Sequence, residues 1–307
     1  MNKPIFILLL FFVLGITLAC ASNRRAIPEN KRRKGPPPID LTGIERIENN
    51  GVTVCYSKGF KEVAIENLER LNKMVDFYKA TIDIEDFKFT FALLAKEDYP
   101  DHAKEIYGMP FCSPEQNIVV VPATDDGCIV QATLPQLRYV DQDTLDLFEA
   151  GGVTPEQGVK MYPLLIGYHE FGHIITESFG LKLSQPINEF TATYFAITFL
   201  DKFEPEIASI YEANINVSPY KPGEKPKYTD IDSFSLGKVN PDDSVANYDW
   251  FQKEFNKIAF EISETLGLDY IIKFKEKLGT DRLSTREELK LISEITPAFE
   301  NWMKENR

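Results

Sequence analysis

The sequence has 307 residues, of which 43% are hydrophobic and 26% are charged, a balance that is typical of a folded globular protein and excludes wholesale disorder. The formal net charge is −13, but residues 1–37 carry seven Lys or Arg and one acidic residue, which leaves 46 acidic against 27 basic residues in the rest of the chain. A body this acidic lacks the Lys and Arg that phosphate binding requires, and this excludes nucleic acid as the main ligand.

The amino terminus is typical of a secretory signal peptide. An uncharged run extends from Ile5 to Ala21 and is too short, and too close to the terminus, to favour a membrane-spanning helix. The letters TLAC at 17–20 resemble a bacterial lipoprotein box, so we assign residues 1–20 to the signal peptide and expect Cys20 to become the lipidated first residue. Cleavage by ordinary signal peptidase at the AxA pattern of 19–21 is the alternative, and it gives a soluble secreted product. The first interpretation predicts an exported protein held at the bacterial cell envelope only through this anchor.

Residues 21–41 are basic and Pro-rich, which predicts a tether between the anchor and the folded body. Beyond the tether the chain has three cysteines, Cys55, Cys112 and Cys128. An odd number in an exported protein implies at least one free thiol or an intermolecular link, and a Cys112–Cys128 disulfide is left open. The absence of any C-x-x-C pair gives no support to a thiolate zinc site.

The remaining residues, 42–307, are expected to form one α+β unit, beginning with an α/β lobe over 42–150. Runs of β-branched and aromatic residues predict strands at 52–56, 87–94 and 117–122, and helical spacing of apolar residues predicts a helix over 63–78. Because the strand at 117–122 ends in Pro, it is a candidate edge strand that could pair with an extended peptide.

The second half is expected to be almost entirely helical. A capping box at Thr154–Gln157 begins a helix that Pro163 should end. A very apolar helix is expected over 164–179 and another over 186–200; together they form the zinc-binding helices of 151–213. A Pro- and Gly-rich loop follows over 214–245. The last segment, 246–307, is a helical lobe with helices at 245–266, at 268–278 and from the cap at 284–287 to the C-terminus.

The candidate chemistry lies in the run His169-Glu170-Phe171-Gly172-His173, inside the very apolar helix. Residues i and i+4 of a helix project from one face about 6 Å apart along the axis, so both imidazoles can reach one ion. Glu170 points about 100° round from His169, where it can take a proton from a metal-bound water. The pattern predicts two zinc ligands and a general base. The alternative, two buried histidines paired with other polar groups, is costly in an apolar helix.

A catalytic zinc ion needs a third protein ligand and one open position. No His follows the motif, so the candidates are the carboxylates of Glu177 and Glu189. Glu177 lies one turn past His173 on the same helix and moves away from the ion, which favours a supporting or surface role. Glu189 begins the next helix, after a turn at Gly180 that can fold it back alongside the ion.

The HExxH run followed by Asn188-Glu189 resembles the gluzincin metallopeptidases, the group that contains thermolysin and the membrane alanyl aminopeptidases. The resemblance covers residues 165–200 and implies a zincin-like fold: a small mixed sheet in the N-lobe, an active-site helix and a mostly helical C-lobe. It implies Zn²⁺ on His169, His173 and Glu189, with Glu170 activating the water.

The resemblance also implies that Asn188 orients a ligand imidazole. It departs from the named families at Thr193, where thermolysin-like enzymes carry an Asp that supports a ligand His, and in lacking the Gly-x-Met-Glu-Asn strand of the aminopeptidases. These departures place the chain in the wider group and in neither named family.

An oxyanion donor completes the expected site, as it does in such enzymes. Tyr248 is the candidate, with Tyr228 as the alternative, although either ring could simply pack at a helix start; His102 is expected to be exposed. The predicted function is zinc-dependent hydrolysis of a peptide bond in a peptide or protein substrate. Two alternatives stay open: a catalytically silent, zinc-containing surface binding lipoprotein, and a zinc amidase that acts on a non-peptide envelope substrate.

Overall fold

The computed structural model describes residues 38–82, 84, 87–103, 106–217, 226–234, 241–280 and 282–305, with side chains described from 247 onward in the helix that begins at 241. The signal peptide, Cys20 and the tether up to residue 37 lie outside the described residues. No helix in the described part of the chain combines the length and the apolar character needed to cross a bilayer.

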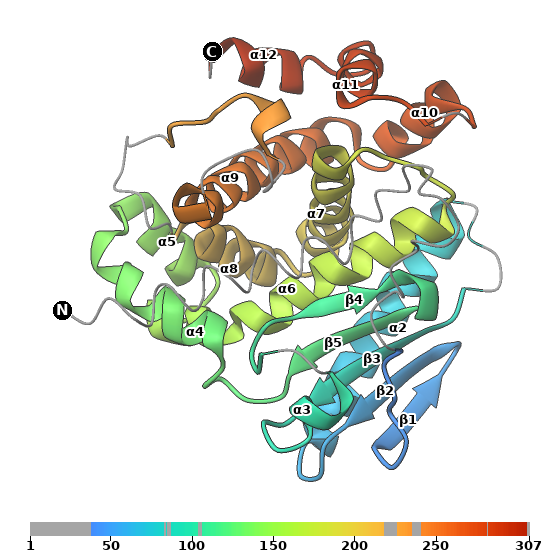
Figure 1. The fold of residues 1–307 in the computed structure, drawn as a ribbon, viewed down its shortest axis with the longest axis vertical. Helices are drawn as coiled ribbons and strands as arrows, with labels where there is room; N and C mark the ends of the chain where they lie inside the picture. The colour runs from blue at the N-terminus through green and yellow to red at the C-terminus, as the bar shows by residue number, and fades with distance from the viewer. Residues whose placement is uncertain are drawn as a thin grey trace.

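A five-stranded mixed sheet forms the N-terminal layer, in the order β1-β2-β3-β5-β4 (Figure 1). Its strands are β1 (Glu45–Asn49), β2 (Val52–Tyr56), β3 (Phe89–Leu94), β4 (Phe111–Ser113) and β5 (Ile118–Pro122). The pairs β2–β3 and β3–β5 are parallel, whereas β1–β2 and β4–β5 are antiparallel. The predicted mixed sheet is confirmed.

The expectation that the strand ending in Pro122 lies at an edge is wrong. All five residues of β5 are buried, and the strand is paired on both sides, with β3 and with β4. The edge strand beyond β5 is the short β4, whose three residues give too little alternation to predict a strand. Pro122 is tolerated because it is the last residue of β5.

Helices α2 (Lys61–Thr81) and α6 (Pro155–Ser178) cover one face of the sheet. The other face is covered by the short α3 (Tyr99–His102) and by partly buried apolar residues of the segment 39–44. A Cβ at Gly167 would lie 2.6 Å from Val121 of β5, so this glycine lets α6 lie close to the sheet.

The prediction that Pro163 ends a helix is wrong. Helix α6, which has 24 residues in all, continues through Pro163, because the capping box at Thr154 fixes its start and its later turns bury against the sheet and α7. That burial exceeds the cost of one lost backbone hydrogen bond. The result is a single long helix that carries the whole HExxH run.

The helical layer centres on α7, which lies between α6 and α9 (Figure 1). Helices α8 and α9 extend into 214–245, so that segment is not irregular throughout, and the last predicted helix is interrupted before Pro297. The helices outside the sheet layer are α4 (Cys128–Thr133), α5 (Gln142–Ala150), α7 (Gln185–Phe203), α8 (Pro205–Asn216), α9 (Pro241–Leu266), α10 (Asp269–Leu278), α11 (Thr285–Ser293) and α12 (Ala298–Glu305).

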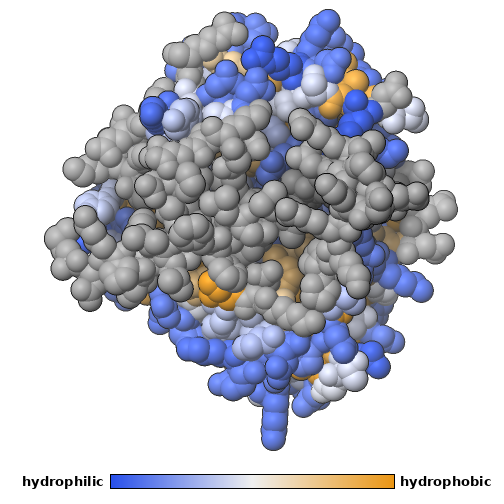
Figure 2. Space-filling view, viewed as in Figure 1, coloured by the Kyte–Doolittle hydropathy of each residue, from blue (hydrophilic) through white to orange (hydrophobic). Residues whose placement is uncertain are grey.

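The described surface is largely hydrophilic over both the C-terminal helices and the sheet (Figure 2). The three described cysteines, Cys55, Cys112 and Cys128, are free thiols, so the Cys112–Cys128 disulfide left open by the sequence is not formed. Burial raises the pKa of the Cys128 thiol to about 11, which keeps it protonated at neutral pH.

Candidate metal centre

Two imidazoles of α6 form the base of the candidate site. His169 and His173 are 6% and 5% exposed, and their ring centroids lie 4.8 Å apart with the ring planes nearly perpendicular. One helical turn separates them, so both rings leave the same face of α6. Glu170 is half-buried beside them, and its ligand atom lies within 4.8 Å of theirs.

The carboxylate of Glu189, on α7, closes the group. Its Oε2 atom lies 3.3 Å from Nε2 of His169 and 3.7 Å from Nε2 of His173, and the residue is 5% exposed. Ligands held 2.0–2.1 Å from a tetrahedral zinc ion are separated by about 3.3–3.4 Å. The two observed separations lie at or just beyond that edge length, so the three atoms fit zinc with a small adjustment.

Gly172 explains how α7 comes so close. A Cβ at this position would lie 2.3 Å from the backbone oxygen of Ala192, nearer than real atoms approach. Of the two positions that the HExxH pattern leaves free, the one that faces Ala192 of α7 is the glycine. Its missing side chain lets the backbone of α7 approach α6 and carry Glu189 to the imidazoles.

Two further α7 side chains fix the orientation of the imidazoles. The amide of Asn188 lies 3.0 Å from Nδ1 of His173, and Oγ1 of Thr193 lies 3.0 Å from Nδ1 of His169. Both Nε2 atoms lie towards Glu189. A histidine that binds a metal through Nε2 carries its proton on Nδ1, so this role needs the Asn188 amide turned to present its oxygen, in place of the nitrogen, to Nδ1 of His173. Thr193 thus contacts the ring that an Asp supports in thermolysin-like enzymes, through a neutral hydroxyl instead of a carboxylate.

Opposing effects set the pKa of the Glu189 carboxyl. Burial alone would raise the pKa, but the charges and hydrogen bonds of His173 and His169 outweigh it and lower the pKa below its usual value. Glu189 is therefore ionised across the neutral range, as a metal ligand must be.

Tyr248 and Gln252 reach the site from α9. The Tyr248 hydroxyl donates to Oε2 of Glu189 at 3.1 Å; Nε2 of Gln252 donates to the same oxygen at 3.1 Å and to the Tyr248 hydroxyl at 2.7 Å. Burial, together with the negative charges of Glu189 and Glu170, raises the pKa of Tyr248 well above its usual value. The phenol is therefore a proton donor.

The other residues weighed in the sequence lie elsewhere. Glu177 is exposed near the end of α6, His102 is hydrogen-bonded to the backbone oxygen of Asp40 on the far face of the sheet, and Tyr228 lies beneath the Lys227 ammonium. None of the three is among the described partners of Glu189.

Sequence reasoning missed Gln252 and Glu288. Gln252 follows Tyr248 by four residues, which a helical reading of 246–266 would have placed on the same face. Glu288 of α11 is fully buried and accepts hydrogen bonds from the backbone N–H (2.8 Å) and the hydroxyl of Ser184, the N-cap residue of α7. No sequence signal points to that contact, because 104 residues separate its partners.

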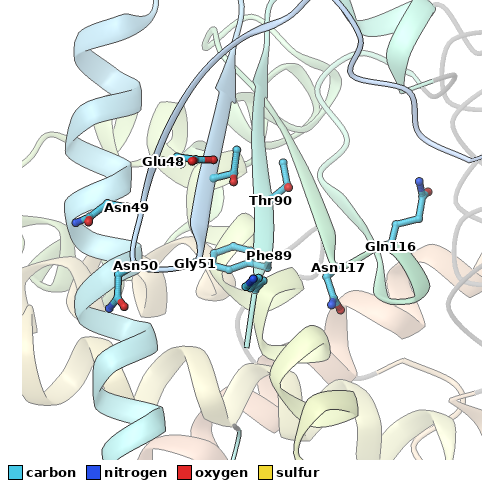
Figure 3. Close-up of a pocket in the computed structure, with 10 residues that line it drawn as sticks. Glu48, Asn49, Asn50, Gly51, Phe89, Thr90, Gln116 and Asn117 are labelled. Carbon is cyan, nitrogen blue, oxygen red and sulfur yellow. The ribbon is translucent and has the colours of Figure 1, made fainter. Parts of the chain in front are cut away.

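A separate pocket lies at the β1–β2 hairpin, the first residues of β3 and the two residues that precede β5 (Figure 3). Its wall is made of amides, hydroxyls, a phenyl ring and two charged side chains: Glu48, Asn49, Asn50, Gly51, Thr53, Lys88, Phe89, Thr90, Gln116 and Asn117. It contains no His or Cys and a single carboxylate. The described side chains that could hold a metal ion gather instead at α6 and α7.

No protein-family model and no curated protein matches the chain. Among solved structures, yeast LTA4 hydrolase in complex with bestatin is similar, with a TM-score of 0.48 and 14% sequence identity. The similarity covers 84% of this chain and 37% of that one, so this chain spans little more than a third of the other protein's length. Likeness at this level carries no information about chemistry, which comes from the site's own side chains.

Proposed function

We propose that this protein is a zinc-dependent hydrolase that cleaves peptide bonds. The observation that carries the proposal is the convergence of two Nε2 atoms and one carboxylate oxygen at separations of 3.3 and 3.7 Å, next to a second carboxylate and a protonated phenol. A structural zinc site is closed by four protein ligands and has no use for an adjacent base. The group described here offers three ligands, a base and a donor.

The ligands in this proposal are His169, His173 and Glu189. Zinc bound there supplies a Lewis acid that acidifies a water molecule and stabilises negative charge on a substrate carbonyl oxygen. Asn188 and Thr193 hold the two imidazoles in the orientation that this binding needs.

The remaining residues move and stabilise charge. Glu170 accepts the proton of the attacking water, because its carboxylate lies beside the ligand atoms and is partly accessible to solvent. The same carboxyl then returns that proton to the leaving amine. Tyr248 donates a hydrogen bond to the oxyanion that forms at the carbonyl carbon, and its raised pKa keeps the proton on the phenol.

A mixed peptide library tests this function. The zinc-loaded protein should cleave peptides, a chelator should stop cleavage, and added zinc should restore it. Metal analysis of the gently purified protein should find about one zinc per chain. Binding of zinc without any cleavage would favour the silent binding lipoprotein, and cleavage confined to non-peptide amides of the envelope would favour the amidase. A protein that neither contains nor binds zinc contradicts all three functions.

Export and lipid anchoring at Cys20 are part of the proposal and are supported by the N-terminal sequence. In a bacterial host, the full-length protein should take up a labelled fatty acid and sediment with membranes. A Cys20→Ser variant should lose both properties. If the variant still sediments with membranes, Cys20 is not the anchor.

A further inference from the structure

Gln252 contacts two groups of the site at once. Its amide nitrogen donates to the Tyr248 hydroxyl at 2.7 Å and to Oε2 of Glu189 at 3.1 Å, while the Tyr248 hydroxyl donates to that same oxygen at 3.1 Å. The three atoms form a closed triangle. Gln252 and Tyr248 are i and i+4 neighbours on α9, so the helix itself holds the two side chains together.

The triangle matters because a phenol has a single proton. The Tyr248 hydroxyl cannot donate to Glu189 and to a substrate oxyanion at the same time. When its proton turns to the oxyanion, a buried ligand carboxylate loses one of its donors, and leaving a buried polar group unpaired is costly. An amide group carries two protons, so Gln252 can keep donating to Glu189 and to the phenol oxygen throughout.

We infer that Gln252 is a positioning residue that releases the Tyr248 proton for catalysis by keeping the Glu189 carboxylate hydrogen-bonded. The inference rests on the proposed hydrolytic function and extends it to a residue outside the ligands, the base and the oxyanion donor. Gln252 also polarises the phenol, because a hydroxyl that accepts a hydrogen bond becomes a stronger donor.

This arrangement has two consequences of opposite kind. Tyr248 and Gln252 both donate to Glu189, so either one alone can keep this carboxylate hydrogen-bonded. Only Tyr248 donates to the oxyanion, and Gln252 acts on it through Tyr248. In a double-mutant cycle, the loss of zinc affinity in the double variant should therefore exceed the sum of the two single losses, whereas its loss of kcat should not exceed that of the Tyr248 variant.

The cycle uses Tyr248→Phe, Gln252→Met and the double variant. Tyr248→Phe should lower kcat by about 10²–10³-fold, and Gln252→Met by about 10–100-fold with little change in KM. The double variant should be no slower than Tyr248→Phe. Zinc Kd, measured by competition with a chelator, should change less than about threefold in each single variant and at least about tenfold in the double variant.

Controls separate this role from a structural one. Lys253→Met changes the next residue of α9, whose partners are other charged groups, and should leave kcat and zinc Kd at the wild-type values. Gln252→Glu keeps the size of the side chain but replaces the donor with a carboxylate beside Glu189, so it should lower kcat at least as much as Gln252→Met does. Thermal melting of each variant checks that it folds.

The experiment tests the role of Gln252 even if the protein cleaves no peptide. If the zinc-loaded wild type cleaves no peptide, the proposed function is wrong. The zinc cycle and the affinity for a peptide phosphonate, a tetrahedral anion, then decide the Gln252 inference. Gln252→Met should weaken phosphonate binding at least about tenfold while leaving zinc bound. Wild-type kcat or phosphonate affinity in Gln252→Met, or additive effects throughout the cycle, would overturn the inference.

Discussion

The two glutamates beside the histidines lie in different places, and the proposed function gives them different roles. Oε2 of Glu189 lies at zinc-ligand separations from both Nε2 atoms, whereas Glu170 follows His169 in the helix and lies beside the ligand group. We therefore expect Glu170→Gln to keep zinc and to lower kcat by about 10²–10⁴-fold, since an amide cannot accept the water's proton. Metal analysis and peptide cleavage measure the two effects. Loss of zinc in this variant would make Glu170 a ligand, and retained cleavage would show that it is not the base.

The assignment of Glu189 as the third ligand has its own test. Glu189→Ala leaves two imidazoles, two ligands short of a tetrahedron, and should lose zinc and activity together. The matched control is Glu177→Ala, which removes an exposed carboxylate one turn past His173 and should retain both. Isothermal titration of the metal-free proteins with zinc measures the difference. A filled site in Glu189→Ala together with an empty one in Glu177→Ala would reverse the assignment.

Thr193 offers a test of the support for the imidazoles. Thr193→Val keeps the shape of the side chain but removes the Oγ1 atom that lies 3.0 Å from Nδ1 of His169. Outer partners of metal ligands contribute about 10–100-fold to affinity, so zinc Kd should rise by that factor. Thr191→Val is the control: Thr191 is equally buried on α7, and its hydroxyl has no partner in the described structure. Its replacement should leave zinc Kd unchanged and stability equal or higher.

At the scale of elements, segments with a strong apolar period could be predicted from the sequence, whereas a proline inside a helix and an exposed, charged strand could not. The predicted helices at 63–78, 186–200 and 268–278 and all three predicted strands are present, because each has a long apolar pattern. The predicted break at Pro163 fails because local propensity is outweighed by burial against the sheet. Strand β1 is missed because its exposed, charged residues show no alternation between apolar and polar.

The contact between α6 and α7 sets the distance of Glu189, the proposed third ligand, from the two imidazoles, and Gly172 permits that contact. In Gly172→Ala the new methyl would lie 2.3 Å from the Ala192 backbone oxygen, so the two helices must separate. We expect a loss of about 1–3 kcal/mol of stability from overpacking and a weaker zinc affinity, since Glu189 moves with α7. Denaturant unfolding and zinc titration measure the two effects.

Gly167→Ala is the matched comparison for that prediction. It adds the same methyl to the same helix, but towards Val121 and Phe91 of the sheet. It should lower stability and leave zinc affinity close to wild type. Equal losses of zinc affinity in both variants would show that general strain in α6, and not the α6–α7 distance, governs the site.

At the scale of the whole molecule, the side chains that the sequence singles out lie together in the structure, and their roles stay predictions: the two imidazoles, both glutamates, Tyr248 and Asn188. It does not identify the residues that join distant segments, because periodicity carries no information about which elements pack together. The order of the sheet, the approach of α9 to α7 and the contact of α11 with the start of α7 are all of this kind. Gln252 and Glu288 become visible only when those elements are assembled.

The contact between α11 and α7 makes stability depend on pH. Glu288 is fully buried, and burial raises the pKa of its carboxyl from 4.5 to about 7, although the hydrogen bonds from Ser184 lower it. Below about pH 4.5 both the folded and the unfolded states are protonated at this residue, and its contribution to stability is complete. As the pH rises from 4.5 to 7, only the unfolded state releases the proton, so the free energy of unfolding falls.

Glu288→Gln should remove that dependence, because the amide resembles the protonated acid and has no proton to release. Relative to wild type, the variant should gain stability between pH 4.5 and 7, by at most about 3 kcal/mol, and the difference should be constant above pH 7. Denaturant unfolding of the metal-free proteins across this range measures it. The neighbouring Glu287 provides the control with opposite sign: hydrogen bonds from Ser284 lower its pKa, so Glu287→Gln should lose stability relative to wild type as the pH rises through the acidic range. If both variants follow the wild-type pH profile, the ionisation of neither carboxyl is linked to folding, and the contact between Glu288 and Ser184 contributes only its hydrogen bonds.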